Sequence, residues 1–159
     1  MCGRELVTLL EGHDRGRLAC ASGHFVHYDN PAATAMAFVQ EGDDFLLLQR
    51  AIEPLRRAWD LPGGFVEAGE HPTETIRREV HEETGLDVLP RRLIGVYTGV
   101  YGDTGRPTLD FAYVCRIRGG HFALGPESMD ARWYPLERFP DPAFASERAA
   151  LEDLRRRMG

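Results

Sequence analysis

The sequence predicts an α/β fold, or an α+β fold, in which a sheet of mixed strands is combined with two helices. Apolar runs of strand length alternate with turns that contain Gly or Asp, and two longer stretches have the apolar spacing of helices. With 159 residues, of which 43% are hydrophobic and 28% charged, the chain matches one globular domain with a short appendage. We expect the appendage over residues 1–31 and the main domain over residues 32–159.

The strands are expected in five places. The apolar runs 33–39 and 45–49 flank a Gly- and Asp-containing turn, which indicates a hairpin. Two further strands are predicted over 93–100 and 109–117, and a last short strand over 132–134. Residues 50–71 are expected to form a structured loop, because large apolar side chains stand among its glycines.

Two helices complete the predicted fold. The stretch 73–84 contains neither Gly nor Pro; Pro72 suits its first position, and Gly85 suits the residue after its end. Residues 146–158 form the second predicted helix, with three arginines near its C-terminal end, where cations suit the helix dipole.

Charge and cysteine usage exclude several functions. The net charge of −6 argues against general binding of nucleic acid, which needs clustered cations. No apolar run approaches the roughly 18–20 residues of a membrane span, and the first residues lack the layout of a secretory signal. Three widely spaced cysteines do not make a disulfide framework. We therefore expect a cytoplasmic protein that does not bind membranes.

The first helix carries a cluster of carboxylates. At 100° per residue, Ile76 and Val80 mark its buried stripe, and Glu79, Glu82 and Glu83 fall beside that stripe within an arc of about 100°. Like charges at this spacing destabilise a helix, and the helix dipole disfavours anions in the last turn. A solvated acidic face would explain the cluster, and so would a bound divalent cation. Oxygen ligands favour Mg²⁺, or Mn²⁺, over Zn²⁺.

Neighbouring residues favour the cation. Arg78 can pair with a nearby carboxylate and hold its side-chain conformation, although an i,i+4 pair with Glu74 is the alternative use of this arginine. Gly63 and Gly64, just upstream, allow the backbone to approach a ligand closely.

The segment 64–86 resembles the Nudix box, the signature of the Nudix hydrolase family. All nine of its specified positions are met, by Gly64, Glu70, Arg78, Glu79, Val80, Glu82, Glu83, Gly85 and Leu86. The residues 59–64 and 127–136 resemble the lead-in and a late loop and strand of the family, so that the resemblance covers about residues 32–157. It implies an α/β/α sandwich with a mixed sheet. It also implies hydrolysis of a nucleoside diphosphate linked to another group; a nucleotide sensor without enzymatic activity is the alternative.

The resemblance implies roles for individual residues. Glu79, Glu82 and Glu83 would be metal ligands, and Arg78 would orient Glu79. Glu70 would support the start of the helix or belong to a further metal shell. A late loop of the family supplies another carboxylate, which we assign to Glu127, with Asp130 as its competitor. The general base is either Glu79 or Glu127.

Substrate-binding residues are expected around the box. Gly63 and Gly64 would approach the substrate, and Arg56 or Arg57 would hold its phosphates. Tyr101, with Tyr97 as a second candidate, would stack on a base or ribose. The substrate is a small nucleotide derivative such as ADP-ribose or a dinucleotide, and the family resemblance also favours a homodimer.

The N-terminal segment resembles a degraded form of the zinc ribbon that precedes some Nudix domains. Cys2 and Cys20 stand where cysteine knuckles are expected, but position 23 is Gly rather than Cys. His13 or His24 could be added as ligands only at unsuitable spacing. We therefore expect a ribbon remnant that packs on the domain and holds no zinc.

Overall fold

A computed structural model describes residues 5–158, and the chain divides into two compact units between Asn30 and Pro31. In the N-terminal unit, β1 (Leu6–Thr8) and β2 (Leu18–Cys20) form an antiparallel hairpin, and an isolated bridge joins Ala19 to Val26. The irregular composition of the segment gave no bounds for these strands. Cys2, one of the two cysteines that suggested a ribbon, lies outside the described residues.

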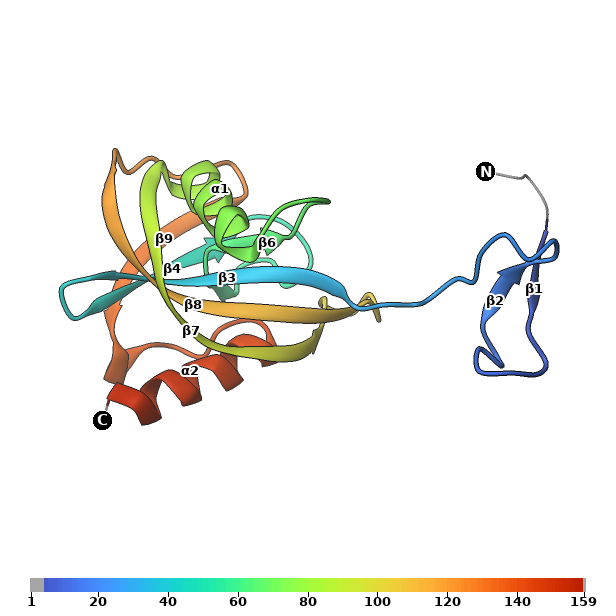
Figure 1. Cartoon of the computed structure of the whole chain (residues 1–159). Helices are drawn as coiled ribbons and strands as arrows, with labels where there is room; N and C mark the ends of the chain where they lie inside the picture. The colour runs from blue at the N-terminus through green and yellow to red at the C-terminus, as the bar shows by residue number, and fades with distance from the viewer. Residues whose placement is uncertain (1–4, 159) are drawn as a thin grey trace. The chain divides into compact units, whose positions relative to one another are not determined.

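The second unit contains a seven-stranded mixed sheet (Figure 1). Strands β3 and β8 pair in parallel in the middle of the order β5-β4-β3-β8-β7, whereas the other pairs are antiparallel, including β6 on β3 and β9 on β4. The strands are β3 (Ala32–Glu41), β4 (Asp44–Arg50), β5 (Trp59–Asp60), β6 (Gly63–Phe65), β7 (Leu86–Val100), β8 (Pro107–Gly120) and β9 (Ser128–Pro135).

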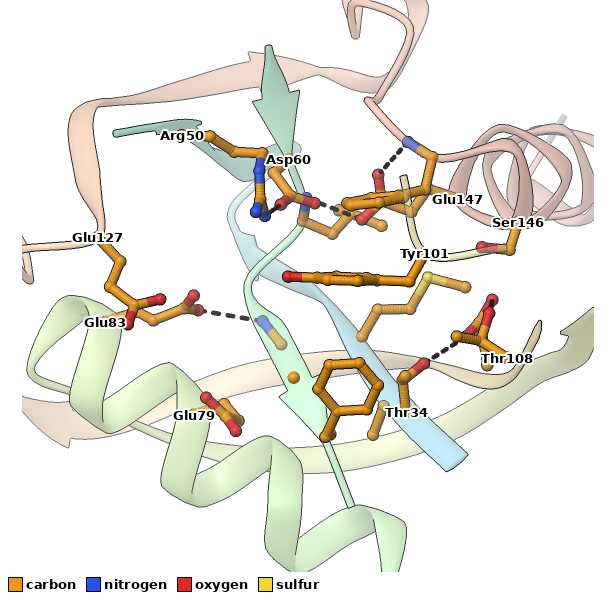
Figure 2. Close-up of a pocket in the computed structure, with 18 of the residues that line it drawn as sticks. Thr34, Arg50, Asp60, Glu79, Glu83, Tyr101, Thr108, Glu127, Ser146 and Glu147 are labelled. Atoms are coloured by element: carbon orange, nitrogen blue, oxygen red, sulfur yellow. Dashed lines mark hydrogen bonds and ion pairs between the residues drawn. The ribbon is translucent and has the colours of Figure 1, made fainter. Parts of the chain in front are cut away.

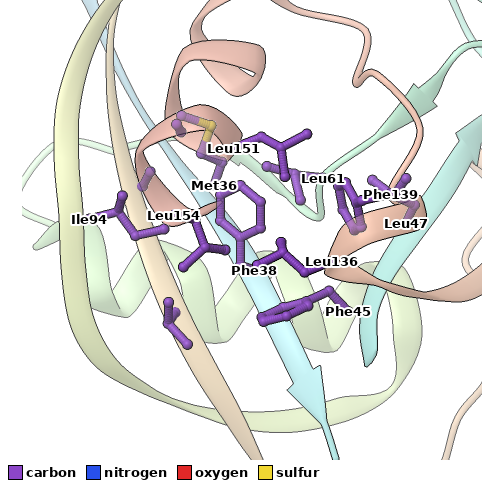
Figure 3. Packing of buried hydrophobic residues seen from close by; sticks show 13 residues of the cluster. Met36, Phe38, Phe45, Leu47, Leu61, Ile94, Leu136, Phe139, Leu151 and Leu154 are labelled. Atoms are coloured by element: carbon purple, nitrogen blue, oxygen red, sulfur yellow. The ribbon is translucent and has the colours of Figure 1, made fainter. Parts of the chain in front are cut away.

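Two helices cover opposite faces of this sheet, α1 (Pro72–Thr84) and α2 (Ala145–Met158) (Figure 1). On one face, Ile76 and Val80 of α1 pack into an apolar cluster with alternate residues of β3 and β4. On the other face, Leu151 and Leu154 of α2 pack around Phe38, as Figure 3 shows. A short 3₁₀ helix, Leu136–Arg138, precedes α2. The predicted α/β/α sandwich with a mixed sheet is confirmed.

The ends of α1 follow from its sequence. Pro72 occupies the first turn; the Thr73 amide donates to His71 Nδ1 at 3.3 Å, and the His71 amide donates to the Glu74 carboxylate at 2.7 Å. Gly85 ends the helix in the left-handed conformation, with φ of 68°. The predicted bounds are thus confirmed. Because Glu74 is engaged at the helix start, it leaves Arg78 to other partners.

Several strands differ in length from the prediction. β7 begins at Leu86 rather than at residue 93, since register shifts near Val88, Pro90 and Leu93 break the alternation that marks a strand. β9 extends the predicted short strand in both directions, and the loop 50–71 contains β5 and β6. Within residues 5–158, no helix combines the length and apolarity needed to span a bilayer.

Candidate active site

A cavity of about 420 Å³ opens beside β6. In Figure 2, Glu79, Glu83 and Glu127 lie on one side of it, Thr34 and Thr108 lie on the other, and Tyr101 lies between them. The carboxylates come from α1 and the loop before β9, whereas the hydroxyls come from β3 and β8. The cavity therefore joins groups that the fold brings from both faces of the sheet.

Two glycines of β6 allow α1 to reach this cavity. A Cβ added at Gly63 would lie 2.2 Å from the Ala35 carbonyl oxygen, and one added at Gly64 would lie 2.4 Å from Glu79 Oε1. The Gly63 amide donates to Glu83 Oε2 at 3.0 Å. The backbone thus approaches the two carboxylates as closely as a side chain would, which only glycine permits.

Arg78 holds the cluster in place. Its Nη1 donates to Glu79 Oε1 at 2.6 Å, its Nε to Glu70 Oε1 at 2.9 Å, and its Nη2 to the Phe65 carbonyl at 3.2 Å. Glu82 is farther, with its Oε2 at 3.5 Å from Nη1. Hydrogen bonds with Glu70, and then with Glu79, raise the pKa of Arg78. This geometry matches the orienting role that the family resemblance implies. The alternative pair of Arg78 with Glu74 is not formed, and Glu70 takes that place.

Glu70 supports this arginine and does not line the cavity. Besides Arg78, its carboxylate accepts hydrogen bonds from the Thr75 hydroxyl at 2.7 Å and the Glu67 amide at 3.1 Å. These bonds, chiefly that with Arg78, lower the pKa of Glu70 to about 2. Of the two roles left open for Glu70, the structure favours support of the helix start over metal ligation.

The remaining carboxylates destabilise one another's charges. Burial raises the pKa of Glu79 in spite of Arg78, and the charges of Glu82 and Glu127 raise it further. Burial raises the pKa of Glu83 well above its usual value, and Asp60 adds to the effect. Glu79, Glu82, Glu83 and Glu127 together line a second cavity of about 180 Å³. A cation placed among them would relieve this repulsion.

The donor set fits a hard divalent cation, because carboxylate oxygens are the ligands that Mg²⁺ and Mn²⁺ prefer. As the side chains stand, no three His, Cys, Asp or Glu residues within 5–158 converge closely enough to share one ion. Glu79 and Glu83 are instead turned to Arg78 and the Gly63 amide. A cation would have to draw these carboxylates together across the smaller cavity.

The competing late carboxylates are separated by the structure. Glu127 lines both cavities. Asp130 lines neither of them and pairs with Arg132, with 2.9 Å between Oδ2 and Nη2. The geometry therefore favours Glu127 over Asp130.

Arg56 and Arg57 do not line the cavity, contrary to the prediction. Arg57 closes a turn, in which its amide donates to the Arg50 carbonyl at 2.9 Å and its own carbonyl accepts from Gln49 Nε2 at 2.9 Å. The arginine in the cavity is Arg50, which forms an ion pair with Asp60. Its Nη2 atom is buried and has no hydrogen-bond partner in the described part of the chain.

The two tyrosine candidates also differ in position. Tyr101 lines the cavity, where its ring stacks on Phe144 at 5.7 Å and meets Phe65 edge-on at 5.1 Å. Tyr97 does not line the cavity: it donates to Asp153 of α2 at 2.9 Å and packs against the core, so the geometry favours Tyr101 as the stacking residue.

Sequence reasoning missed the polar end of the cavity, which Thr34, Thr108, Asp110, Ser146 and Glu147 line. Glu147 accepts hydrogen bonds from the Leu61 and Phe144 amides, both at 3.2 Å. Burial, and then Asp60, raise its pKa well above the usual value. Its place at the start of α2 was the one available signal, since an acidic residue there commonly bonds backbone amides.

Comparisons with known proteins identify the family. Residues 30–154 match the family model described as the NUDIX domain. The chain is 30% identical over 132 residues to the ADP-ribose pyrophosphatase of Methanocaldococcus jannaschii, covering 83% of this chain and 78% of that protein. It is 36% identical over 154 residues to the putative nudix hydrolase 1 of Caenorhabditis elegans, covering 85% of this chain but 41% of that protein.

A solved structure agrees over nearly the whole chain. The crystal structure of a NUDIX hydrolase from Nitrosomonas europaea superposes with a TM-score of 0.80 at 28% identity, covering 99% of this chain and 88% of that one. The human 8-oxo-dGDP phosphatase NUDT18 is 35% identical over 121 residues, and the chain spans 36% of its length. The chain belongs to the NUDIX family and is a Nudix hydrolase, as the box at residues 64–86 indicated.

Proposed function

We propose that this Nudix hydrolase uses Mg²⁺, or Mn²⁺, to cleave the pyrophosphate bond of a nucleoside diphosphate linked to another group. The observation that carries the proposal is a set of four carboxylates around one end of a cavity of about 420 Å³, namely those of Glu79, Glu82, Glu83 and Glu127. Polar and aromatic side chains line the rest of this cavity, which suits the remainder of a nucleotide. The similarity to an ADP-ribose pyrophosphatase makes ADP-ribose a candidate substrate, and a dinucleotide is another.

The proposed roles follow the geometry of the side chains. Glu79, Glu82, Glu83 and Glu127 would hold the cation, which neutralises the diphosphate and lowers the pKa of a bound water. Arg78 fixes Glu79 through a 2.6 Å hydrogen bond and is itself fixed by Glu70. The Gly63 amide fixes Glu83 in the same way.

One proton has to be taken from the attacking water. Glu79 and Glu127 both line the cavity, and we propose that one of these two carboxylates accepts this proton. The two carboxylates lie close enough for the charge of Glu127 to raise the pKa of Glu79, so both are within reach of one water molecule bound between them.

The test is a screen for product release from nucleotide derivatives with Mg²⁺, followed by the double variant Glu82→Gln/Glu83→Gln. Metal catalysis contributes several kcal/mol, so the double variant should lose at least about 100-fold in kcat. The matched control is Glu137→Gln/Glu152→Gln, which removes two exposed carboxylates. Near-normal turnover by the first variant would contradict the metal mechanism. Nucleotide binding without turnover of any derivative would instead support a sensor.

Three finer expectations belong to the same proposal. A homodimer is tested by light scattering after size-exclusion chromatography, and a cytoplasmic location by fractionation of the source cells. That the N-terminal unit is a zinc-free ribbon remnant packed on the domain is tested by metal analysis and by comparing the unfolding of the full chain with that of a chain beginning at Asn30. About one zinc per chain, or identical unfolding, would contradict it.

A further inference from the structure

The far end of the cavity is a wall of hydrogen-bonding side chains built around Asp110. Thr34 lies opposite Asp110 in the parallel pairing of β3 with β8, and Thr108 lies two residues earlier on β8. Because side chains alternate along a strand, Thr34 and Asp110 face the same side as Met36 and Ala112, which pack in the cluster under α2. Ser146 completes the wall from the first turn of α2.

Asp110 is a buried carboxylate that pairs with no basic side chain among the described residues. It is 5% exposed, and its two oxygens accept hydrogen bonds from the Thr34 hydroxyl and from the Thr108 hydroxyl, the latter at 3.0 Å. Among residues 5–158 no Arg or His forms an ion pair with it. A carboxylate has about four acceptor positions, so roughly two are left for a ligand. A buried charge is costly unless such groups are supplied.

Gly99 of β7 allows the backbone to lie directly against this carboxylate. A Cβ at this position would lie 2.7 Å from Asp110 Oδ2, 2.9 Å from Thr108 Oγ1 and 3.2 Å from Ser146 Oγ. Its φ is not left-handed, so the backbone itself does not require glycine here. Gly99 lines a neighbouring cavity rather than this one, so the missing side chain lets Asp110, Thr108 and Ser146 converge against the backbone of β7.

The surroundings favour a flat ligand with two adjacent donors. The rings of Phe65, Tyr101 and Phe144 line the same cavity, which suits a base better than a sugar. A guanine-type edge presents its N1–H and N2–H groups side by side, as a carboxylate requires for two parallel hydrogen bonds. An adenine-type edge sets a ring nitrogen acceptor beside its amino group, and this acceptor would face a carboxylate oxygen.

We propose that Asp110, held by Thr34 and Thr108, makes this site select nucleotides whose base presents two adjacent N–H donors, over adenine nucleotides. The inference rests on the proposed function in placing a nucleotide in this cavity, and it narrows the candidate substrates to derivatives with a guanine-type base instead of ADP-ribose. A ribose diol also offers two adjacent donors, and the test separates the two sources. Each bidentate contact with a base discriminates by on the order of 10- to 100-fold, so a guanine preference of that size is expected.

The test measures Kd by calorimetry for the α,β-methylene analogues of GDP and ADP, which are not cleaved at that bond. The wild-type protein should bind the GDP analogue more tightly, and Asp110→Asn should reverse the order, because an amide presents one donor and one acceptor. Asp141→Asn, which removes the same charge from an exposed position, should leave the order unchanged. A guanine-to-adenine ratio of affinities unaffected by Asp110→Asn overturns the proposal.

Two further measurements, on the variant Gly99→Ala and with 2′-deoxy analogues, distinguish binding of the base from binding of the sugar. Gly99→Ala places a Cβ 2.7 Å from Asp110 Oδ2 and displaces the carboxylate, so it should abolish the preference without reversing it, even if Asp110→Asn fails to fold. If Asp110→Asn weakens both analogues equally and 2′-deoxy analogues are insensitive to it, the wall binds the sugar and the proposal is overturned. Because binding is measured without cleavage, a protein that hydrolyses no diphosphate derivative but shows the reversal would refute the proposed function alone.

Discussion

Replacing Gly64 by alanine is expected to abolish most of the activity while leaving the fold intact. The added Cβ would lie 2.4 Å from Glu79 Oε1 and 2.5 Å from its Cδ. Ordinary contacts begin at 3.4 Å, so the carboxylate has to move by about 1 Å. This displacement carries Glu79 away from Arg78 Nη1, which it now meets at 2.6 Å.

The magnitudes separate activity from stability. Misplacing a catalytic group by about 1 Å costs up to about 100-fold in rate. Loss of the pair between Arg78 and Glu79, whose side chains are 26% and 18% exposed, costs about 1 kcal/mol at most. Alanine in a strand regains roughly 0.5–1 kcal/mol relative to glycine. The net change in the free energy of unfolding is therefore within about 1 kcal/mol, and Tm should move by no more than about 4 °C.

The assay compares kcat/KM and Tm of the wild type and Gly64→Ala on a substrate found in the screen. The matched control is Gly119→Ala on β8, where the added Cβ would meet its nearest atom, Asp87 Oδ2, at 3.7 Å. The Tm of both variants should lie within about 4 °C of the wild-type Tm, and only Gly64→Ala should lose activity. Retention of activity within about threefold of the wild type would show that the position of Glu79 does not govern the reaction.

Three other substitutions have definite expected outcomes. Arg78→Lys should lower kcat by about 10- to 100-fold with little change in KM, because lysine cannot hold Glu70 and Glu79 together; equal kcat would argue against the orienting role. Tyr97→Phe should cost about 0.5–1.5 kcal/mol in urea unfolding near neutral pH. Folding raises the pKa of Tyr97 to about 12, so its contribution is full below pH 10 and is lost as pH rises through 12; a cost independent of pH would contradict this. Leu151→Ala, at a side chain 1% exposed, should cost about 2–5 kcal/mol, and a smaller loss would mean that α2 repacks.

The sequence predicts α1 and its carboxylates because the relevant interactions are local. Capping by His71 and Gly85 involves residues within a few positions of the helix ends, and the orientation of Glu79, Glu82 and Glu83 follows from helix periodicity. The partner of Arg78 shows the limit of this reasoning. Spacing along the helix suggested Glu74, yet Glu70 folds back from the preceding loop over eight residues of sequence.

The polar end of the cavity could not be predicted because it depends on strand register. Thr34 and Asp110 are 76 residues apart in sequence and meet only when β3 and β8 pair in parallel. The same holds for the arginine that lines the cavity: a basic pair in a loop suggested Arg56 and Arg57, whereas the chain turns so that Arg50, at the end of β4, enters the cavity. Neither the register nor the course of this loop leaves a periodic pattern in the sequence.

This division between local and distant contacts predicts how substitutions combine. Glu79 is held by Arg78, and Asp110 by Thr34 and Thr108, so the two carboxylates share no hydrogen-bond partner. Effects of sites without shared partners add in free energy, within about 0.5 kcal/mol. In the double variant Gly64→Ala/Asp110→Asn, kcat should therefore fall by the product of the factors found for the two single variants, and the base preference should shift as it does in Asp110→Asn alone. A departure larger than about threefold would mean that base recognition and hydrolysis are coupled, through movement of β6 between β3 and α1, since Phe65 of β6 pairs with Thr34.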